Sequence, residues 1–208
     1  MFQLLNVIYS VIPYWYNPDI HNMGNIGFSG KMHAITTPLF TKLIDKIAYE
    51  GVDIRKQIYD TLEGDVLDIC CGTGFSTKPG SIGIDTSREM LKYANLYNPG
   101  SSYIFGNAET FGKTNQFDTV SCMFAFHEIP KEGHIAIIEN CIRVARKKVI
   151  IVDISTTYNP SELMLSGEPY IKDYINDVDA TLYDFEKKSI IEKHVDMWVY
   201  QKSSNALL

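Results

Sequence analysis

Apolar residues follow two periods along this chain, and the alternation of the two predicts a layered α/β fold. Short apolar runs with the length and β-branched content of buried strands occupy residues 65–70, 81–85, 102–105, 117–123 and 149–154. Segments with apolar residues at helical spacing lie between or before these runs, at 37–49, 54–62, 87–97 and 130–145. This alternation predicts a doubly wound, Rossmann-like sheet that is mostly parallel.

The last quarter of the chain is expected to complete this sheet. A helical stretch, punctuated by Asn159-Pro160 and Gly167-Glu168-Pro169, reaches about residue 178. The strand-rich segment 189–200 then suits a final antiparallel hairpin. Five runs and two hairpin strands make a seven-stranded sheet.

The connection between the first two predicted strands is too short to hold a full crossover helix, so its helix is expected to be shortened to about one turn. Seven residues lie between Gly74 and Ile82, whereas a crossover with its helix normally takes a dozen or more. The sheet face beside these strands would then expose apolar area unless another segment covers it. We expect the uncharged segment from Leu4 to Ile12 to form a helix that provides this cover.

The N-terminal residues 1–60 are predicted to form a helical or lid extension on a core of residues 61–208, within one domain. Turn formers between Tyr14 and Gly30 argue against long regular structure there. Thr37-Pro38 then marks the start of the first helix that the spacing predicts.

Composition and charge narrow the class of protein. The chain has 208 residues with a formal charge of -6, 21% charged and 45% hydrophobic residues. Such a balance argues against a nucleic-acid partner, which usually requires a basic face, and favours a small-molecule substrate. The four cysteines have no spacing typical of zinc or iron–sulfur ligands, so we expect reduced thiols, a cytoplasmic protein and no metal.

The extreme N-terminus is apolar without being a clear targeting segment. Residues 1–16 carry no charge, lack the basic start of a signal peptide, and are interrupted at Pro13 well short of a bilayer span. Packing on the domain is the expected role, and contact of residues 1–12 with a membrane surface is the alternative.

The most specific pattern follows the first two predicted strands. A glycine-rich turn, Cys70 to Gly74, comes directly after the apolar run that contains Asp68, and Asp85 ends the second strand. Glycines allow the backbone to turn tightly beside a ligand. Ligands of open α/β sheets bind beyond the carboxyl ends of the strands, where both acids would lie. An acid that ends the second strand commonly accepts hydrogen bonds from ribose hydroxyls, so the pattern predicts a nucleoside cofactor site.

From roughly Gly64 to Ile154, the chain resembles the class I S-adenosylmethionine-dependent methyltransferases. The motifs that carry the resemblance are the Asp68 to Gly74 turn, the acid Asp85 followed by a helix start, the Gly106-Asn107-Ala108-Glu109 turn and the fourth strand. The resemblance implies S-adenosylmethionine as cofactor and S-adenosylhomocysteine as product. It further implies cofactor contacts at Asp68, Cys70, Gly72, Thr73, Gly74, Asp85, Thr86, Met90, Asn107, Ala108, Glu109 and Met123.

Candidate catalytic residues follow the fourth strand, where members of this family place residues that face the substrate. His127 is the leading candidate for a general base, since an ordinary histidine accepts a proton near neutral pH. Glu128 is the second candidate, although it also suits the N-terminus of the helix that opens at Pro130. Substrate contacts are expected from Tyr14, Tyr16, His21, His33, Phe124 and Asp153.

The predicted function is methyl transfer to an oxygen, nitrogen or sulfur atom of a small molecule, by a monomer or homodimer. A nicotinamide-linked oxidoreductase is disfavoured because position 77 is Thr77 rather than glycine and Asp85 comes only 11 residues after Gly74. A non-catalytic module that binds S-adenosylmethionine stays open as an alternative.

Overall fold

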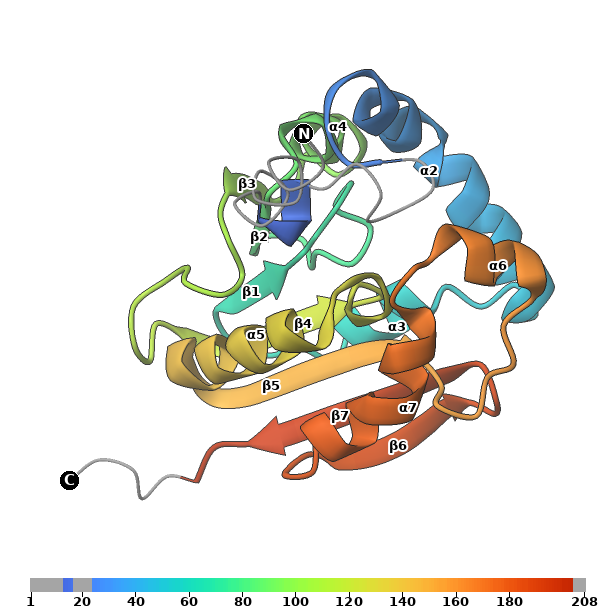
Figure 1. The fold of residues 1–208 in the computed structure, drawn as a ribbon. Helices are drawn as coiled ribbons and strands as arrows, with labels where there is room; N and C mark the ends of the chain where they lie inside the picture. The colour runs from blue at the N-terminus through green and yellow to red at the C-terminus, as the bar shows by residue number, and fades with distance from the viewer. Residues whose placement is uncertain (1–12, 17–23, 204–208) are drawn as a thin grey trace, which may run out of the picture.

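The computed structural model describes residues 13–16 and 24–203. Its centre is a seven-stranded sheet in the order β3-β2-β1-β4-β5-β7-β6 (Figure 1). The strands span Val66–Ile69 (β1), Ile82–Asp85 (β2), Ser102–Phe105 (β3), Phe117–Met123 (β4), Ala145–Ile154 (β5), Glu186–Ile191 (β6) and Val195–Gln201 (β7). β7 runs antiparallel to both of its neighbours, and the other pairs are parallel. The predicted seven-stranded, mostly parallel sheet with a final hairpin is confirmed.

Both faces of the sheet are apolar, which explains why its central strands appear as continuous apolar runs. In β5, Val149 and Ile151 join one core cluster, while Ile150 and Val152 join the other. Helices α5 (Lys131–Val144) and α7 (Ile171–Thr181) cover the first face, and α3 (Ile54–Tyr59) lies on the second (Figure 1). The strand ends therefore remain the open edge where a ligand can approach.

The start of strand β5 differs from the sequence prediction. β5 begins at Ala145, four residues before the predicted start at 149. Its first residues include the charged Arg146 and Lys147. These side chains pair with Asp118 at the surface, so the apolar signal is missing there although the backbone is already extended. Helix α4 (Arg88–Tyr97) begins as predicted, with the Ser87 hydroxyl accepting from the Met90 amide.

Helix α2 (Gly27–Ala48) begins ten residues before the predicted start, and Pro38 lies inside it. A proline removes only one amide donor, so the remaining hydrogen bonds of α2 can continue the helix past Pro38. The expectation of irregular structure up to Gly30 is therefore wrong for residues 27–30. Helix α2 packs against α4 (Figure 1), and α6 (Glu162–Gly167) follows β5 in the chain.

The connection between β1 and β2 is short, as predicted, but it contains no helix, so the prediction of a shortened crossover helix is wrong. It covers the sheet with its own buried polar residues: the Asp68 carboxylate, 0% exposed, accepts from the hydroxyls of Ser76 at 2.8 Å and Thr77 at 2.7 Å. The loop is thereby fixed on top of β1. The helix predicted from Leu4 to Ile12 lies outside the described residues.

Among the residues that the structure describes, no helix combines the length and the apolar character needed to cross a bilayer.

Candidate active site

A cavity of about 590 Å³ opens at the carboxyl ends of the strands. Its walls come from the connections after β1, β2, β3 and β4, from α2, and from the segment around α6. This location is the one expected for ligands of an open α/β sheet. The sequence-predicted residues that line it are Tyr14, His33, Cys70, Gly72, Thr73, Asp85, Thr86, Met90, Asn107, Ala108, Met123, Phe124, His127 and Glu128.

The turn after β1 is tied to the end of β2. Cys70 and Gly72 have φ values of 53° and 50°, in the left-handed region that glycine tolerates best. This conformation directs the Gly72 amide to the Asp85 carboxylate, which accepts from it at 2.9 Å and from the Ser87 amide at 2.8 Å. Burial raises the pKa of Asp85, and the amides that donate to it oppose the rise. Asp85 therefore links two strand ends while it borders the cavity.

Asp68 and Gly74, both predicted to contact the cofactor, do not line the cavity. Asp68 points into the loop described above, and burial raises its pKa to about 6 although the hydroxyls of Thr77, Ser76 and Ser121 lower it. Gly74 has a φ of 81°, and a side chain there would overlap the Tyr103 ring. Both residues shape the turn from behind the wall.

The turn after β3 holds one predicted residue in the wall and one behind it. Asn107 lines the cavity, and its side-chain oxygen accepts from the Glu109 amide at 2.9 Å. Glu109 does not line the cavity, because its carboxylate accepts from the Tyr14 hydroxyl at 2.7 Å. This bond places η1 (Tyr14–Tyr16) on the β3 side of the cavity. The Tyr16 side chain and all of His21 lie outside the described part of the chain.

The end of β4 carries a buried histidine–carboxylate pair. His127, in the 3-10 helix η3 (Phe126–Glu128), has its Nδ1 atom 2.6 Å from the Asp153 Oδ1 atom, and its amide donates to Asp153 Oδ2 at 3.2 Å. Asp153 is 0% exposed and does not line the cavity, so its predicted contact with substrate is replaced by contact with His127.

The state of His127 differs from that of an ordinary histidine. Burial lowers its pKa, but the charge and hydrogen bond of Asp153, with Glu128 and Glu168 nearby, outweigh burial and raise the pKa to about 9. The raised pKa favours the imidazolium form near neutral pH, whereas an ordinary histidine, as predicted from the sequence, would be ready to accept a proton there.

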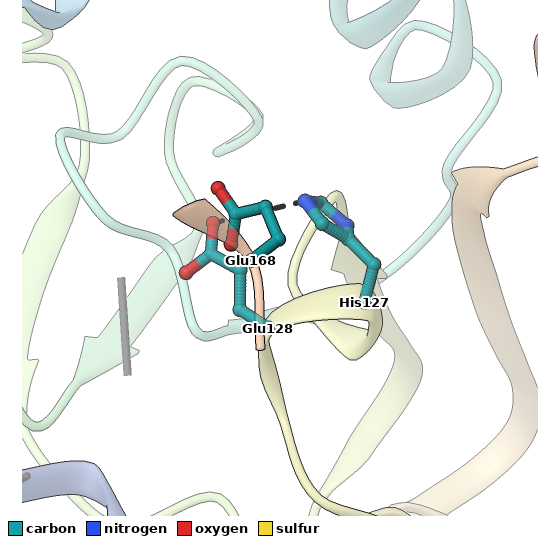
Figure 2. Close-up of side chains that lie close together, drawn as sticks. All are labelled: His127, Glu128 and Glu168. Atoms are coloured by element: carbon teal, nitrogen blue, oxygen red, sulfur yellow. Dashed lines mark ion pairs between the residues drawn. The ribbon is translucent and has the colours of Figure 1, made fainter. Parts of the chain in front are cut away.

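Sequence reasoning missed Glu168 and Arg55, both of which line the cavity. Glu168 follows α6, and its motif with Gly167 and Pro169 signals only a break in the helix. In Figure 2 the side chains of His127, Glu128 and Glu168 gather at one point, with their possible ligand atoms all within 4.8 Å of one another. The Arg55 guanidinium lies 4.3 Å from the centre of the Phe124 ring, and no local pattern in the sequence signals either contact.

Part of the chain matches a known family model. Residues 66–148 match the sequence model of a family described as a methyltransferase domain. A comparison with proteins of curated function gives no significant match.

Solved structures share the fold at low sequence identity. A SAM-dependent methyltransferase from Aquifex aeolicus is 18% identical, with a TM-score of 0.56 over 79% of this chain and 97% of that one. The PH0226 protein from Pyrococcus horikoshii OT3 is 16% identical, with a TM-score of 0.53 over 95% and 99% of the two chains. Magnesium protoporphyrin IX methyltransferase from Synechocystis PCC 6803, solved with bound SAM, is 17% identical, with a TM-score of 0.50 over 91% and 90%. Over residues 66–148 this chain is therefore similar to a methyltransferase domain, and it shares the fold of these solved structures.

Proposed function

We propose that this protein transfers the methyl group of S-adenosylmethionine to a small molecule that binds in the cavity at the strand ends. The observation that carries the proposal is that one cavity joins two different ends. The Gly72–Asp85 turn lies at one end, and the His127–Asp153 pair lies at the other. The first suits the cofactor and the second suits the methyl acceptor.

At the cofactor end, Asp85 is proposed to accept hydrogen bonds from the ribose hydroxyls. Each of its oxygens accepts one backbone amide, and a carboxylate oxygen has a second lone pair available. Asn107 and Ala108 are proposed to flank the adenine, and Met90 and Met123 to contact the nucleoside. The backbone of Gly72 and Thr73 lies where the methionine part would approach.

At the acceptor end, the chemistry requires mainly position. The methyl carbon leaves a sulfonium that is already activated, so alignment of the acceptor atom can contribute roughly 7 to 11 kcal/mol. His127 and Glu128 are proposed to hold the acceptor, with Phe124 and His33 on its other sides. Because the raised pKa of His127 favours its imidazolium form near neutral pH, we assign it a hydrogen-bond donor's role rather than that of a base.

The acceptor molecule is proposed to be partly apolar. Helix α2 contributes Phe40 and Ile44 to the wall, and Met164 of α6 adds a third apolar side chain. We propose that the described part of residues 1–60 forms an extension of the core, residues 61–208, on the side where the acceptor binds. The formal charge of -6 disfavours nucleic acid as acceptor.

Two measurements test the proposal. Calorimetry should show binding of S-adenosylmethionine and none of NAD, and transfer of a labelled methyl group from the cofactor to a mixture of metabolites should give a labelled small molecule. Binding without transfer to any acceptor would instead support the non-catalytic module. Failure to bind the nucleoside would contradict the assignment of the cavity.

A further inference from the structure

We propose that His127, Glu128 and Glu168 form a binding site for a first-row divalent cation at the acceptor end of the cavity. The three residues come from two segments, since Glu168 lies 41 residues after His127. Figure 2 shows their side chains converging from η3 and from the segment that follows α6. This site is separate from the cofactor end, and it contains none of the cysteines on which the expectation of no metal was based.

The spacing of the ligand atoms suits one ion. The His127 Nε2 atom lies 3.9 Å from the Glu128 Oε1 atom, and all three possible ligand atoms lie within 4.8 Å of one another. Ligands bound at about 2.0 to 2.2 Å in tetrahedral or octahedral geometry are separated by roughly 3 to 4.4 Å. A small inward rotation of the glutamates would therefore bring all three atoms to one centre.

A second feature, independent of this spacing, fixes the histidine as a ligand. Asp153 holds the ring through Nδ1 at 2.6 Å and holds the backbone of the same residue through its amide at 3.2 Å. The other nitrogen, Nε2, then faces Glu128. A bound ion would take the place of the proton that Nε2 otherwise carries, and His127 and Glu128 would then hold the acceptor through the ion. A histidine that ligates a metal through one nitrogen almost always donates its other N–H to a carboxylate or carbonyl. The buried carboxylate is in the position that such an arrangement requires.

The charges at this end favour a cation. Three carboxylates, those of Asp153, Glu128 and Glu168, surround one histidine, and two of these acids line the cavity. The donor set of one imidazole nitrogen and two carboxylate oxygens leaves coordination positions open. It suits a cation such as Mn²⁺, Fe²⁺ or Zn²⁺, since carboxylates favour hard ions and imidazole favours the later first-row metals.

The open positions suggest which acceptors the site would take. An oxygen donor of the acceptor would occupy one of them, beside the apolar wall that α2 and α6 provide. This consequence rests on the proposed methyl transfer, whereas the cation site itself does not. The acceptor class would be a molecule with a hydroxyl or phenolic oxygen on an apolar body.

The test is titration of the full chain with Mn²⁺, without cofactor or acceptor. The electron paramagnetic resonance signal of the free ion measures how much Mn²⁺ is bound. We expect one Mn²⁺ to bind per chain, and Glu128→Gln and Glu168→Gln each to weaken binding at least tenfold. The matched control is Glu139→Gln, an exposed glutamate on α5, which should leave Mn²⁺ affinity unchanged.

Thermal unfolding keeps the test independent of folding defects. Mn²⁺ should raise the Tm of the wild type and of Glu139→Gln, but not the Tm of folded Glu168→Gln. The proposal is overturned if the wild type binds no Mn²⁺, or if both glutamine variants at the site bind it as well as the control does. Calorimetry with S-adenosylmethionine on the same samples separates the two proposals. A protein that binds the nucleoside but not Mn²⁺ would reject only the cation site. A protein that binds Mn²⁺ but not the nucleoside would reject only the cofactor assignment.

Discussion

The two ends of the cavity are built in different ways. The cofactor end consists of short connections that directly follow β1, β2 and β3, and its central contact joins Gly72 to Asp85, 13 residues apart. The acceptor end combines α2, η3, the end of β5 and the segment after α6, with His127 and Asp153 26 residues apart. Groups close together in the sequence, including backbone amides, therefore define the cofactor end. Buried side chains from distant segments define the acceptor end.

Removing the carboxylate of Asp153 is expected to have the largest effect on stability. Asp153→Ala leaves the buried ring of His127 without its charged partner, and loss of one member of a buried ion pair costs about 3 to 5 kcal/mol. Urea unfolding should show this loss, whereas Asp65→Ala, which removes an exposed partner of Arg146, should change the unfolding free energy little. Affinity for S-adenosylmethionine should stay within threefold of wild type in folded Asp153→Ala; a large drop would mean that the two ends are not independent.

Gly74 supplies the second test, because it stands behind the cofactor end. Gly74→Ala places a side chain at a φ of 81° and against the Tyr103 ring, and left-handed strain and overpacking together should destabilise the fold by roughly 2 to 4 kcal/mol. Gly80 is the matched control: it has a φ of 85°, but a Cβ there would meet no atom within 4 Å. Gly80→Ala should therefore lose only the strain, roughly 1 to 2 kcal/mol. Equal losses in urea unfolding would show that Tyr103 does not restrict this turn.

Asp68 predicts a dependence of stability on pH. Its folded pKa of about 6 lies above its unfolded value of about 3.9, so the stability it contributes is complete below pH 4 and is lost as the pH rises through 6. The loss amounts to at most about 3 kcal/mol by order of magnitude. Asp68→Asn, which cannot ionise, should therefore gain stability relative to wild type between pH 4 and pH 7. Parallel pH profiles of the two unfolding free energies would contradict the raised pKa.

The smallest expected effects act on binding and directly separate the two ends. Asp85→Ala should weaken binding of S-adenosylmethionine at least tenfold, about 1.4 kcal/mol, because the ribose hydroxyls lose a charged acceptor. His127→Ala should leave this affinity within threefold while it slows methyl transfer at least tenfold. Calorimetry and a labelled-methyl assay give the two values. The same change in affinity for both variants would erase the distinction between the ends.

Much of the fold could be predicted because its signals are local. The strands β1, β2 and β4 are continuous apolar runs, and the turn with Gly72 and Asp85 follows them directly. The start of α2 could not be found in this way, because Pro38 has the same local appearance at the start of a helix as inside one.

Prediction of the site was limited by partners that are distant in the sequence. His127 was found because it follows β4, but its pKa depends on Asp153 and Glu168, which no short motif connects to it. Asp68 illustrates the opposite case: its position before the turn suggested contact with a ligand, and only the folded loop shows that Ser76 and Thr77 both donate to its Oδ2 atom.

The helix-free connection between β1 and β2 has a consequence for how the protein opens. A helix protects its amides by a continuous ladder of internal bonds. This loop has only isolated backbone bonds, such as that from the Thr77 amide to the Gly74 carbonyl, beside the hydroxyls of Ser76 and Thr77 on the Asp68 carboxylate. Local opening there breaks few bonds, so its amides should exchange with deuterium well before those of β1. Because Thr73 and Ser76 border the cavity, nucleoside binding should slow this exchange, and the loop would act as the entrance through which the cofactor passes.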